Sequence, residues 1–213
     1  EPDLDAEALA RFDALTADAG DAGTLAAGIQ EAAADSRPKM AGVTERSRLV
    51  VGRRVRPNAA TASNARVHAA LATRAFEAVA AELHEEYREI DHPTGSAFGR
   101  DGAVASLQRL FRSRAPYYEF ELLATLGERL LLTRRHTGAS GDTRGLYDVG
   151  PYENEAIEIS EVNGHGLFCR EEIFAADRLG AAVPRLYERH AELLPEGPER
   201  ERAAATARSV AGG

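Results

Sequence analysis

Apolar residues in the first half of the chain recur at helical spacing in two separate places. Residues 3–17 carry leucine, alanine and phenylalanine on one stripe, which predicts an amphipathic helix. A second region begins at Asn58, which follows a proline and is a good helix N-cap. The pattern there predicts two successive helices, the second carrying Phe76, and then a strand over residues 87–92 that Pro93 ends.

The spacing of apolar residues changes from helical to alternating in the second half of the chain. A third helix is expected from its cap, Asp101, to Pro116. A closing helix is expected from Asp177, and Pro184 inside it should kink or shorten it. Between these helices lie two hairpins, because glycine-containing turns separate alternating segments. Their strands are expected at residues 117–125, 130–137, 152–162 and 167–174, with a long loop over 138–151.

This order of elements predicts the α+β class. We expect a cone-shaped, curved antiparallel sheet wrapped by three helices, with a pocket between the layers and an N-terminal helical arm. Four segments follow along the chain: an amphipathic helix over 1–18, a linker over 19–57, the cone domain over 58–194 and a charged tail over 195–213. The tail is rich in alanine and charge, so little is expected to hold it to a core.

Composition narrows the classes of partner. The 213 residues carry a net charge of −8, which disfavours binding to nucleic acid or to an anionic membrane surface. No apolar run approaches the roughly 18 residues of a membrane span, and no secretion signal is evident. Cys169 is the only cysteine, so no intrachain disulfide forms, and a cytoplasmic location is expected. Heavy use of arginine and alanine is typical of a GC-rich bacterial genome.

Several short motifs resemble the SnoaL-like family. They are Tyr87-Arg-Glu-Ile-Asp-His-Pro93, Gly99-Arg-Asp-Gly102, Ile157-Glu-Ile-Ser-Glu-Val-Asn-Gly164 and Phe174-Ala-Ala-Asp177. That family belongs to the superfamily of nuclear transport factor two, with ketosteroid isomerases, polyketide cyclases and limonene epoxide hydrolases. The resemblance implies a homodimer formed through the sheets. It also looks like the modules repeated in bacterial multidomain regulators, in which case residues 3–17 would close a preceding module and neighbouring domains would be partners.

Asp91 and His92 form the sharpest candidate site. Adjacent residues on a strand face opposite sides, so only one of the two can point into the cone. A carboxylate in an apolar cone would have a raised pKa and could accept a proton as a general base. In the alternative interpretation Asp91 ends the strand by binding nearby backbone, and His92 packs on Pro93.

The run Arg134-Arg135-His136 on the second hairpin strand is a further candidate. One strand orientation places Arg134 and His136 together, and the other isolates Arg135. The resemblance to epoxide-opening relatives implies that Arg134 lies between Asp91 and either of two glutamates, Glu155 or Glu172. The alternative is a solvated outer face with salt bridges across the strands. Tyr118 is a candidate phenol at the pocket mouth.

Ligand contacts are expected from aromatic and acidic residues around the cone. We predict them for Tyr87, Phe111, Phe120, Glu155 and Glu172. No phosphate-binding glycine loop, nucleophile elbow or convincing metal-ligand spacing is present in the sequence, so neither a cofactor nor a metal is expected.

Three functions are compatible with these patterns. The first is a module that binds a small apolar ligand or mediates association within a larger regulator. The second is an isomerase, cyclase or epoxide hydrolase that acts on an apolar natural product. Asp91 would be its general base, Tyr118 or His136 would polarise an oxygen, and Arg134 would orient the acid. The third is a structural spacer whose cone is filled by Phe76, Leu107, Phe111 and Phe120.

Overall fold

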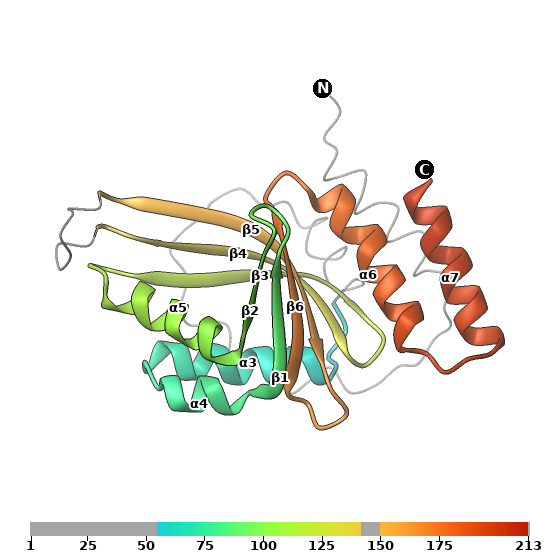
Figure 1. Ribbon diagram of the computed structural model, residues 1–213, viewed down its shortest axis with the longest axis horizontal. Helices are drawn as coiled ribbons and strands as arrows, with labels where there is room; N and C mark the ends of the chain where they lie inside the picture. Colours follow the sequence, from blue (N-terminus) through green and yellow to red (C-terminus); the bar gives the residue numbers. More distant parts are fainter. Residues whose placement is uncertain (1–54, 142–149, 213) are drawn as a thin grey trace, which may run out of the picture.

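The computed structural model of the chain describes residues 55–141 and 150–212 (Figure 1). The helix expected over 3–17 and the linker before residue 55 lie outside these residues. The described helices are α3 (Ala59–Ala72), α4 (Phe76–Ala81), α5 (Arg100–Arg112), α6 (Leu179–Leu193) and α7 (Pro198–Ala211). The strands are β1 (Leu83–Asp91), β2 (Ser96–Gly99), β3 (Tyr117–Leu126), β4 (Leu130–Ala139), β5 (Tyr152–Val162) and β6 (Phe168–Ala175).

Six strands form one sheet in the order β2-β1-β6-β5-β4-β3. Neighbouring strands are antiparallel, with one exception: β1 and β6 are parallel, with Asp91 beside Ile173. The expected antiparallel sheet is therefore mixed. Short turns fix the direction of β3 relative to β4 and of β5 relative to β6, whereas β1 and β6 are far apart in sequence and no local turn sets their relative direction. The short strand β2 lies in a segment that was expected to be a loop.

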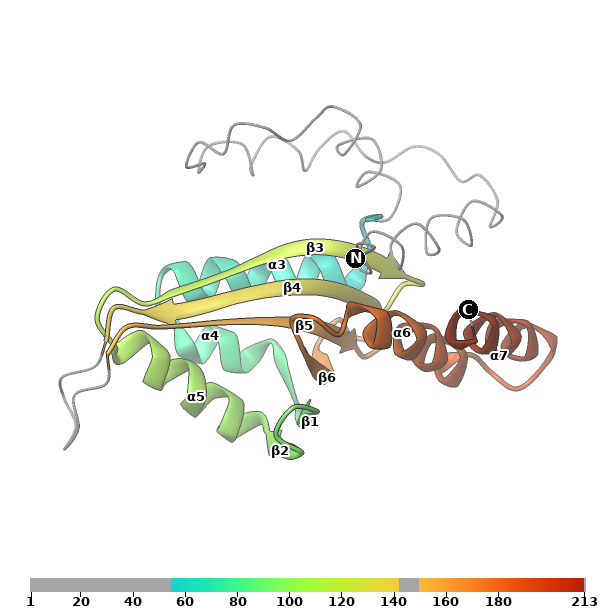
Figure 2. The same cartoon turned by 90° about the horizontal axis from the view of Figure 1, so that it is seen from above.

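The two faces of the sheet are covered by different helices. On one face, a core of buried side chains joins α3 and α5 to the sheet, and it includes Leu131 of β4. On the other face, a second core joins α6 and α7 to the sheet, and it includes Leu132 of the same strand. Alternation of side chains along β4 sends these two neighbours in opposite directions. Seen from above, α6 and α7 extend beyond one end of β3, β4 and β5, and α4 and α5 lie beside these strands (Figure 2). The α+β class with a curved sheet and helical cover is confirmed.

The C-terminal part of the chain differs from its expected structure. Pro184 lies inside α6, and the helix runs on to Leu193. The proline is the sixth of the 15 residues of α6, so its missing N–H removes one hydrogen bond within the helix, and the helix continues past it. Residues 198–211, expected to be a loosely held tail, form α7, and Ala207 and Val210 are buried in the same core as α6. None of the helices in residues 55–141 and 150–212 is long and apolar enough to cross a membrane.

Asn58 fastens the start of α3 to the sheet. Its Oδ1 accepts a hydrogen bond from the Thr61 amide at 2.9 Å, and the Thr61 hydroxyl accepts one from the Asn58 amide at 2.9 Å. This reciprocal pair satisfies two amides at the helix start, as in a capping box. The Asn58 Nδ2 also donates to the carbonyl oxygens of Gly127 and Leu130, both at 3.0 Å. One side chain thus orients the helix and holds the turn between β3 and β4.

Replacing Asn58 with alanine should therefore lower the free energy of unfolding by about 2 kcal/mol, because a helix cap and two tethering bonds are lost together. Asn58→Ser keeps the capping acceptor and loses only the bonds from Nδ2, so it should cost about half as much. Urea denaturation followed by circular dichroism measures both values. Equal losses for the two variants would contradict a separate contribution of the cap.

Candidate functional site

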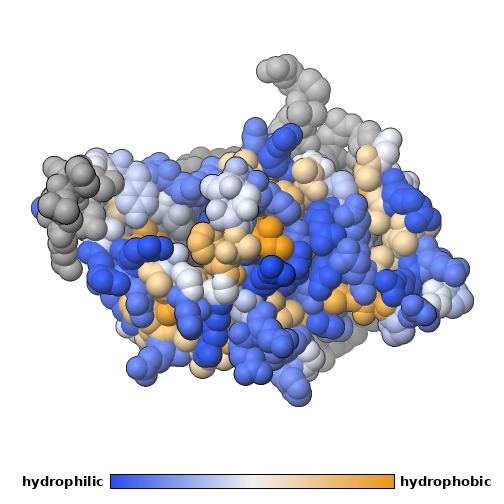
Figure 3. Space-filling model, viewed as in Figure 1, coloured by the Kyte–Doolittle hydropathy of each residue, from blue (hydrophilic) through white to orange (hydrophobic). Residues whose placement is uncertain are grey.

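A cavity of about 280 Å³ lies between the helices α3, α4 and α5 and the sheet. Four of the candidates from the sequence line it: Tyr87, Asp91, Tyr118 and Phe120. Helices contribute uncharged residues to the wall, and the sheet contributes both aromatic and ionisable ones. Because the space is open, the interpretation as a spacer with a filled cone is not supported. On the face seen in Figure 3, hydrophilic side chains dominate the surface, with smaller hydrophobic patches between them.

An ion pair lies on the sheet side of this cavity. Nη1 of Arg135 on β4 contacts Oε1 of Glu158 on β5, and the two side chains are only 17% and 5% exposed. The guanidinium also lies over the Tyr118 ring, 5.9 Å from its centroid. Burial raises the pKa of Glu158 and Arg135 lowers it, with a net rise. Burial and Glu158 together hold the pKa of the Tyr118 phenol far above its usual range, against the opposing effect of Arg135.

A second polar group in the cavity is built around Glu171 of β6. Its Oε2 accepts a hydrogen bond from the Tyr87 hydroxyl at 2.5 Å, and its Oε1 lies 3.3 Å from the Ser160 hydroxyl. Burial, followed by repulsion from Glu158 and Glu89, raises the pKa of Glu171 to about 8. Burial and Glu158 also raise the pKa of Glu89. Near neutral pH Glu171 is therefore mostly a neutral acid.

The contacts of the Tyr87 hydroxyl indicate that one of its two carboxyl neighbours carries a proton. Its hydroxyl is 2.5 Å from Glu171 and 3.3 Å from Glu89, on the same strand as Tyr87. A phenol has one hydrogen to donate, so it can bond to two carboxyl groups only if one of them carries a proton. The cavity wall thus holds both a hydrogen-bond donor and hydrogen-bond acceptors within a few ångströms.

Asp91 lines the cavity, but its carboxylate is already engaged with the backbone. Its Oδ1 accepts a hydrogen bond from the Thr94 amide at 2.9 Å, in the turn that leads to β2. This is the strand-ending contact that the sequence allowed as an alternative. His92 lies on the opposite face, where its ring stacks on Phe174 with centroids 4.4 Å apart.

Five further candidates from the sequence do not face this cavity. Arg134 pairs with Glu155 at 2.6 Å on the outer face of the sheet, and His136 lies 3.9 Å from the same glutamate. Glu172 also lies on that face. The expected set of Arg134 between Asp91 and Glu155 or Glu172 is therefore corrected: strand alternation places Arg135, not Arg134, on the cavity side. Phe111 lines a separate groove beside β3 and packs edge-on against Phe76.

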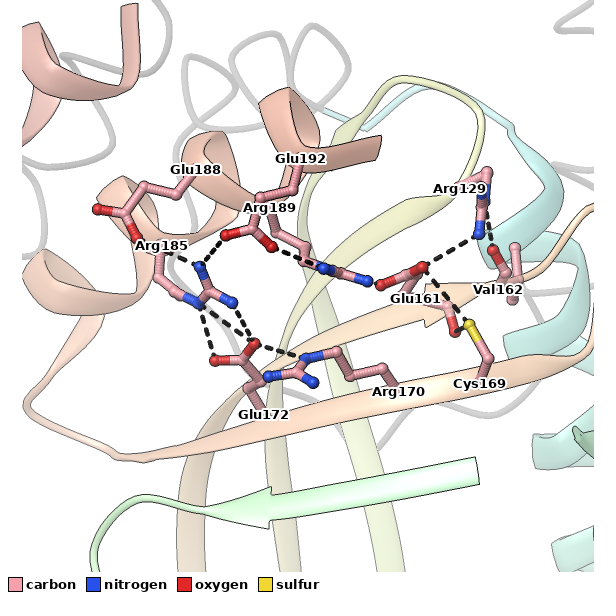
Figure 4. A network of polar contacts seen from close by, with 10 residues as sticks. All are labelled: Arg129, Glu161, Val162, Cys169, Arg170, Glu172, Arg185, Glu188, Arg189 and Glu192. Atoms are coloured by element: carbon pink, nitrogen blue, oxygen red, sulfur yellow. Dashed lines mark hydrogen bonds and ion pairs between the residues drawn. The ribbon is translucent and has the colours of Figure 1, made fainter. Parts of the chain in front are cut away.

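The glutamates of the outer face join the sheet to α6 (Figure 4). Glu172 is 1% exposed and accepts from Arg170 at 2.8 Å, from Arg185 at 3.0 Å and from His92 at 3.0 Å. Although burial raises the pKa of Glu172, hydrogen bonds from the two arginines and the histidine lower it to about 2 overall. These ion pairs and hydrogen bonds join β6 to α6 and form a structural junction between them.

A second glutamate of the outer face, Glu161, is held in a similar way. It bonds to Arg189 of α6 at 2.6 Å and to Arg129 at 3.1 Å, and it lies beside Cys169 (Figure 4). Burial and Glu161 raise the pKa of the Cys169 thiol to about 11, so the thiol is protonated near neutral pH and is a poor nucleophile.

Sequence reasoning missed three ionisable groups of the cavity: Glu89, Glu158 and Glu171. For Glu158 the alternation of β5 could have indicated the cavity side, because Glu158 points to the face opposite to that of the apolar Ile157 and Ile159. Within residues 55–141 and 150–212, no group of three or more His, Cys, Asp or Glu side chains is placed to hold a metal ion.

No protein-family model and no curated protein matches the sequence. Among solved structures, similar backbones include a protein from Xanthomonas campestris assigned as a polyketide cyclase, with 19% identity over 54% of this chain and 88% of that chain, at a TM-score of 0.44. Another, from Kribbella flavida and assigned as a ketosteroid isomerase, has 20% identity over 55% of this chain and 76% of that chain, at a TM-score of 0.42.

A protein from Mycobacterium tuberculosis, solved in complex with estradiol-17β-hemisuccinate, has 13% identity over 55% of this chain and 93% of that chain, at a TM-score of 0.44. The fold assignment rests on the strand order, register and layers of the chain itself. By these, residues 59–193 have the α+β cone architecture that the resemblance to the SnoaL-like family implied.

Proposed function

We propose that this chain is a small-molecule-binding module and that its ligand occupies the cavity between α3–α5 and the sheet. One observation supports this more than any other: an open space of about 280 Å³ is lined by both apolar residues and buried ionisable groups. Burying such groups costs folding free energy, and proteins place them in this way mainly at functional sites. The volume, near the lower end of ligand pockets, suits a ligand of one or two rings.

The arrangement favours binding over the catalytic set expected from the sequence. Of that set, only Asp91 and Tyr118 face the cavity, and Asp91 is bonded to the Thr94 amide. Arg134 and His136, which would orient the acid and polarise an oxygen, lie on the other face. The proposal therefore places the chain as a binding or association module within a larger bacterial protein, with Asp91 as general base retained only as the enzymatic alternative.

The homodimer that the resemblance implied stays a prediction. Part of the outer face of the sheet is already covered, because α6 packs there over Leu132 and Ile159. The end of that face that carries Arg134 and Glu155 is the part on which such a contact would form.

A blocking substitution at the mouth of the cavity tests the proposal. Ser106 is an exposed residue of α5 that lines the cavity, and its neighbour Ala105 is exposed and does not line it. Ser106→Trp should lower the affinity for a neutral probe, 1-naphthalenemethanol, at least tenfold, whereas Ala105→Trp should leave it unchanged. The measurement is the shift of backbone amide signals of cavity residues in NMR titrations.

Two outcomes would contradict the binding role. One is that the probe shifts no cavity amide, or that both tryptophan variants bind it equally well. The other is turnover of an epoxide or a β,γ-unsaturated ketone that Asp91→Asn abolishes, because this would establish an enzyme.

A further inference from the structure

The cavity holds more acid than base. Among the described residues that line it, four carry a carboxyl group and one carries a guanidinium. The carboxyl groups are those of Glu89, Asp91, Glu158 and Glu171, and the guanidinium is that of Arg135.

The one guanidinium is paired through Nη1, while its Nε is buried without a hydrogen-bond partner among the described residues. Arg135 contacts Glu158, and this pair accounts for one of the four acids. Asp91 is held by a backbone amide. Glu89 and Glu171 then share the hydroxyl of Tyr87 and have no cationic side chain bonded to them among the described residues. Glu89 and Glu171 thus face the cavity with only neutral hydroxyl groups bonded to them among the described residues.

The elements around Glu171 leave this imbalance uncorrected. From β1 it faces Tyr87 and Glu89, from β5 Glu158 and Ser160, from β4 Arg135 and from β3 Tyr118. The helices α3, α4 and α5 contribute only uncharged residues to the cavity wall. The wall thus holds four carboxyl groups and one guanidinium, so a positive charge between Glu89 and Glu171 would offset the imbalance. Burial and repulsion among the carboxyl groups raise the pKa of Glu171, as expected where no cation is bonded to it.

We propose that the ligand is an apolar amine, with its ammonium group between Glu89 and Glu171 and its apolar body against the aromatic and aliphatic wall. This inference rests on the proposed function and adds the chemical class of the ligand. An ammonium supplies the donors that these carboxyl oxygens accept, and the apolar lining suits the rest of the ligand. A carboxylate or phosphate ligand would add to the negative charge of the lining, so it should bind less tightly than the amine.

Three probes that share one ring system test this. They are 1-naphthylmethylamine, 1-naphthalenemethanol and 1-naphthoic acid, which carry a cationic, a neutral and an anionic group on the same body. The amine should bind at least ten times more tightly than the alcohol, and the acid should bind most weakly. Calorimetric titration in buffers of different ionisation enthalpy should show proton release for the amine at pH 7, because its charge favours the ionised form of Glu171.

The variants Glu171→Gln and Glu89→Gln should each reduce the preference for the amine over the alcohol to less than threefold. The Glu171→Gln variant is expected to keep the fold, since the oxygen of the new amide still accepts the Tyr87 hydrogen. Glu155→Gln, the same change on the other face of the sheet, is the matched control and should alter neither affinity.

If the alcohol binds as tightly as the amine, the inference is overturned while the proposed function stands. If none of the three probes shifts the cavity amides, the proposed function fails as well.

Discussion

Glu172→Ala should lower the free energy of unfolding by about 3 kcal/mol, which is the lower end of the range for breaking a buried ion pair. The carboxylate is 1% exposed and is the shared acceptor of Arg170, Arg185 and His92. Its removal leaves charged donors without their acceptor at the junction of β6 and α6. Both arginines are partly exposed, so water can replace some of the lost bonds, and the loss stays below the upper limit of the range.

The matched control is Glu188→Ala. Glu188 pairs with the same Arg185 at 3.3 Å, but its side chain is 49% exposed. Because exposed ion pairs contribute little, this variant should lose less than about 1 kcal/mol. Urea unfolding at pH 7 measures both values. Similar losses for the two variants would show that burial of Glu172 is not what makes the junction strong.

Lowering the pH should reduce the difference in stability between these variants. The pKa of Glu172 is lowered to about 2 in the folded protein, below its ordinary value in the unfolded chain. Its stabilising contribution is thus complete above the unfolded pKa of about 4.5 and disappears as the pH falls through 2. Wild-type and Glu188→Ala protein should lose stability over that interval, and Glu172→Ala should lack this part of the loss.

Arg135→Met should cost a comparable amount, about 3–5 kcal/mol at pH 8, because it leaves Glu158 as an unpaired charge in the cavity. The loss should grow as the pH rises above about 4.5. A carboxyl whose pKa is higher in the folded state than in the unfolded chain destabilises the protein once the unfolded form ionises. Removing Arg135 raises the pKa of Glu158 further, since the guanidinium is the group that lowers it.

Two comparisons identify the cause of that loss. The double variant Arg135→Met with Glu158→Gln should recover most of the stability, because the unpaired charge is gone. Arg134→Met, the same change one residue earlier, affects a pair on the outer face whose glutamate is 39% exposed, and it should cost about 1 kcal/mol or less. If the double variant is no more stable than Arg135→Met alone, the guanidinium stabilises the fold by packing and not by charge.

Several ends of the elements could be predicted because local chemistry marks them, although Asp101, expected as the cap of α5, lies within its first turn and makes no capping bond. Asn58 caps α3 as expected, Gly127 adopts a positive φ of 58° in the turn between β3 and β4, and the strands of both hairpins lie close to their expected bounds. The parallel pairing of β1 with β6 has no such local mark. It depends on where the chain returns after a long intervening stretch of helix and hairpin, which no single turn determines.

The candidate site was predicted only in part, for a related reason. Arg134, Arg135 and His136 are three polar residues in a row, so alternation within that run does not show which side chains face the cavity. The answer lies in Leu131, which faces α3 and α5 and has the parity of Arg135. In the same way, the sequence cannot distinguish the adjacent glutamates Glu171 and Glu172. Their roles differ because α6 packs on the face of the sheet that carries Glu172, whereas Glu171 faces the cavity.

That last pair has a mechanical consequence. One peptide bond separates the acid that faces the cavity from the acid that holds α6, and a paired strand is too stiff to let adjacent residues move independently. A displacement of β6 on the cavity side would therefore reach the arginines of α6 directly. The shortest mechanical path from the cavity to α6 crosses the sheet and does not run around its edge.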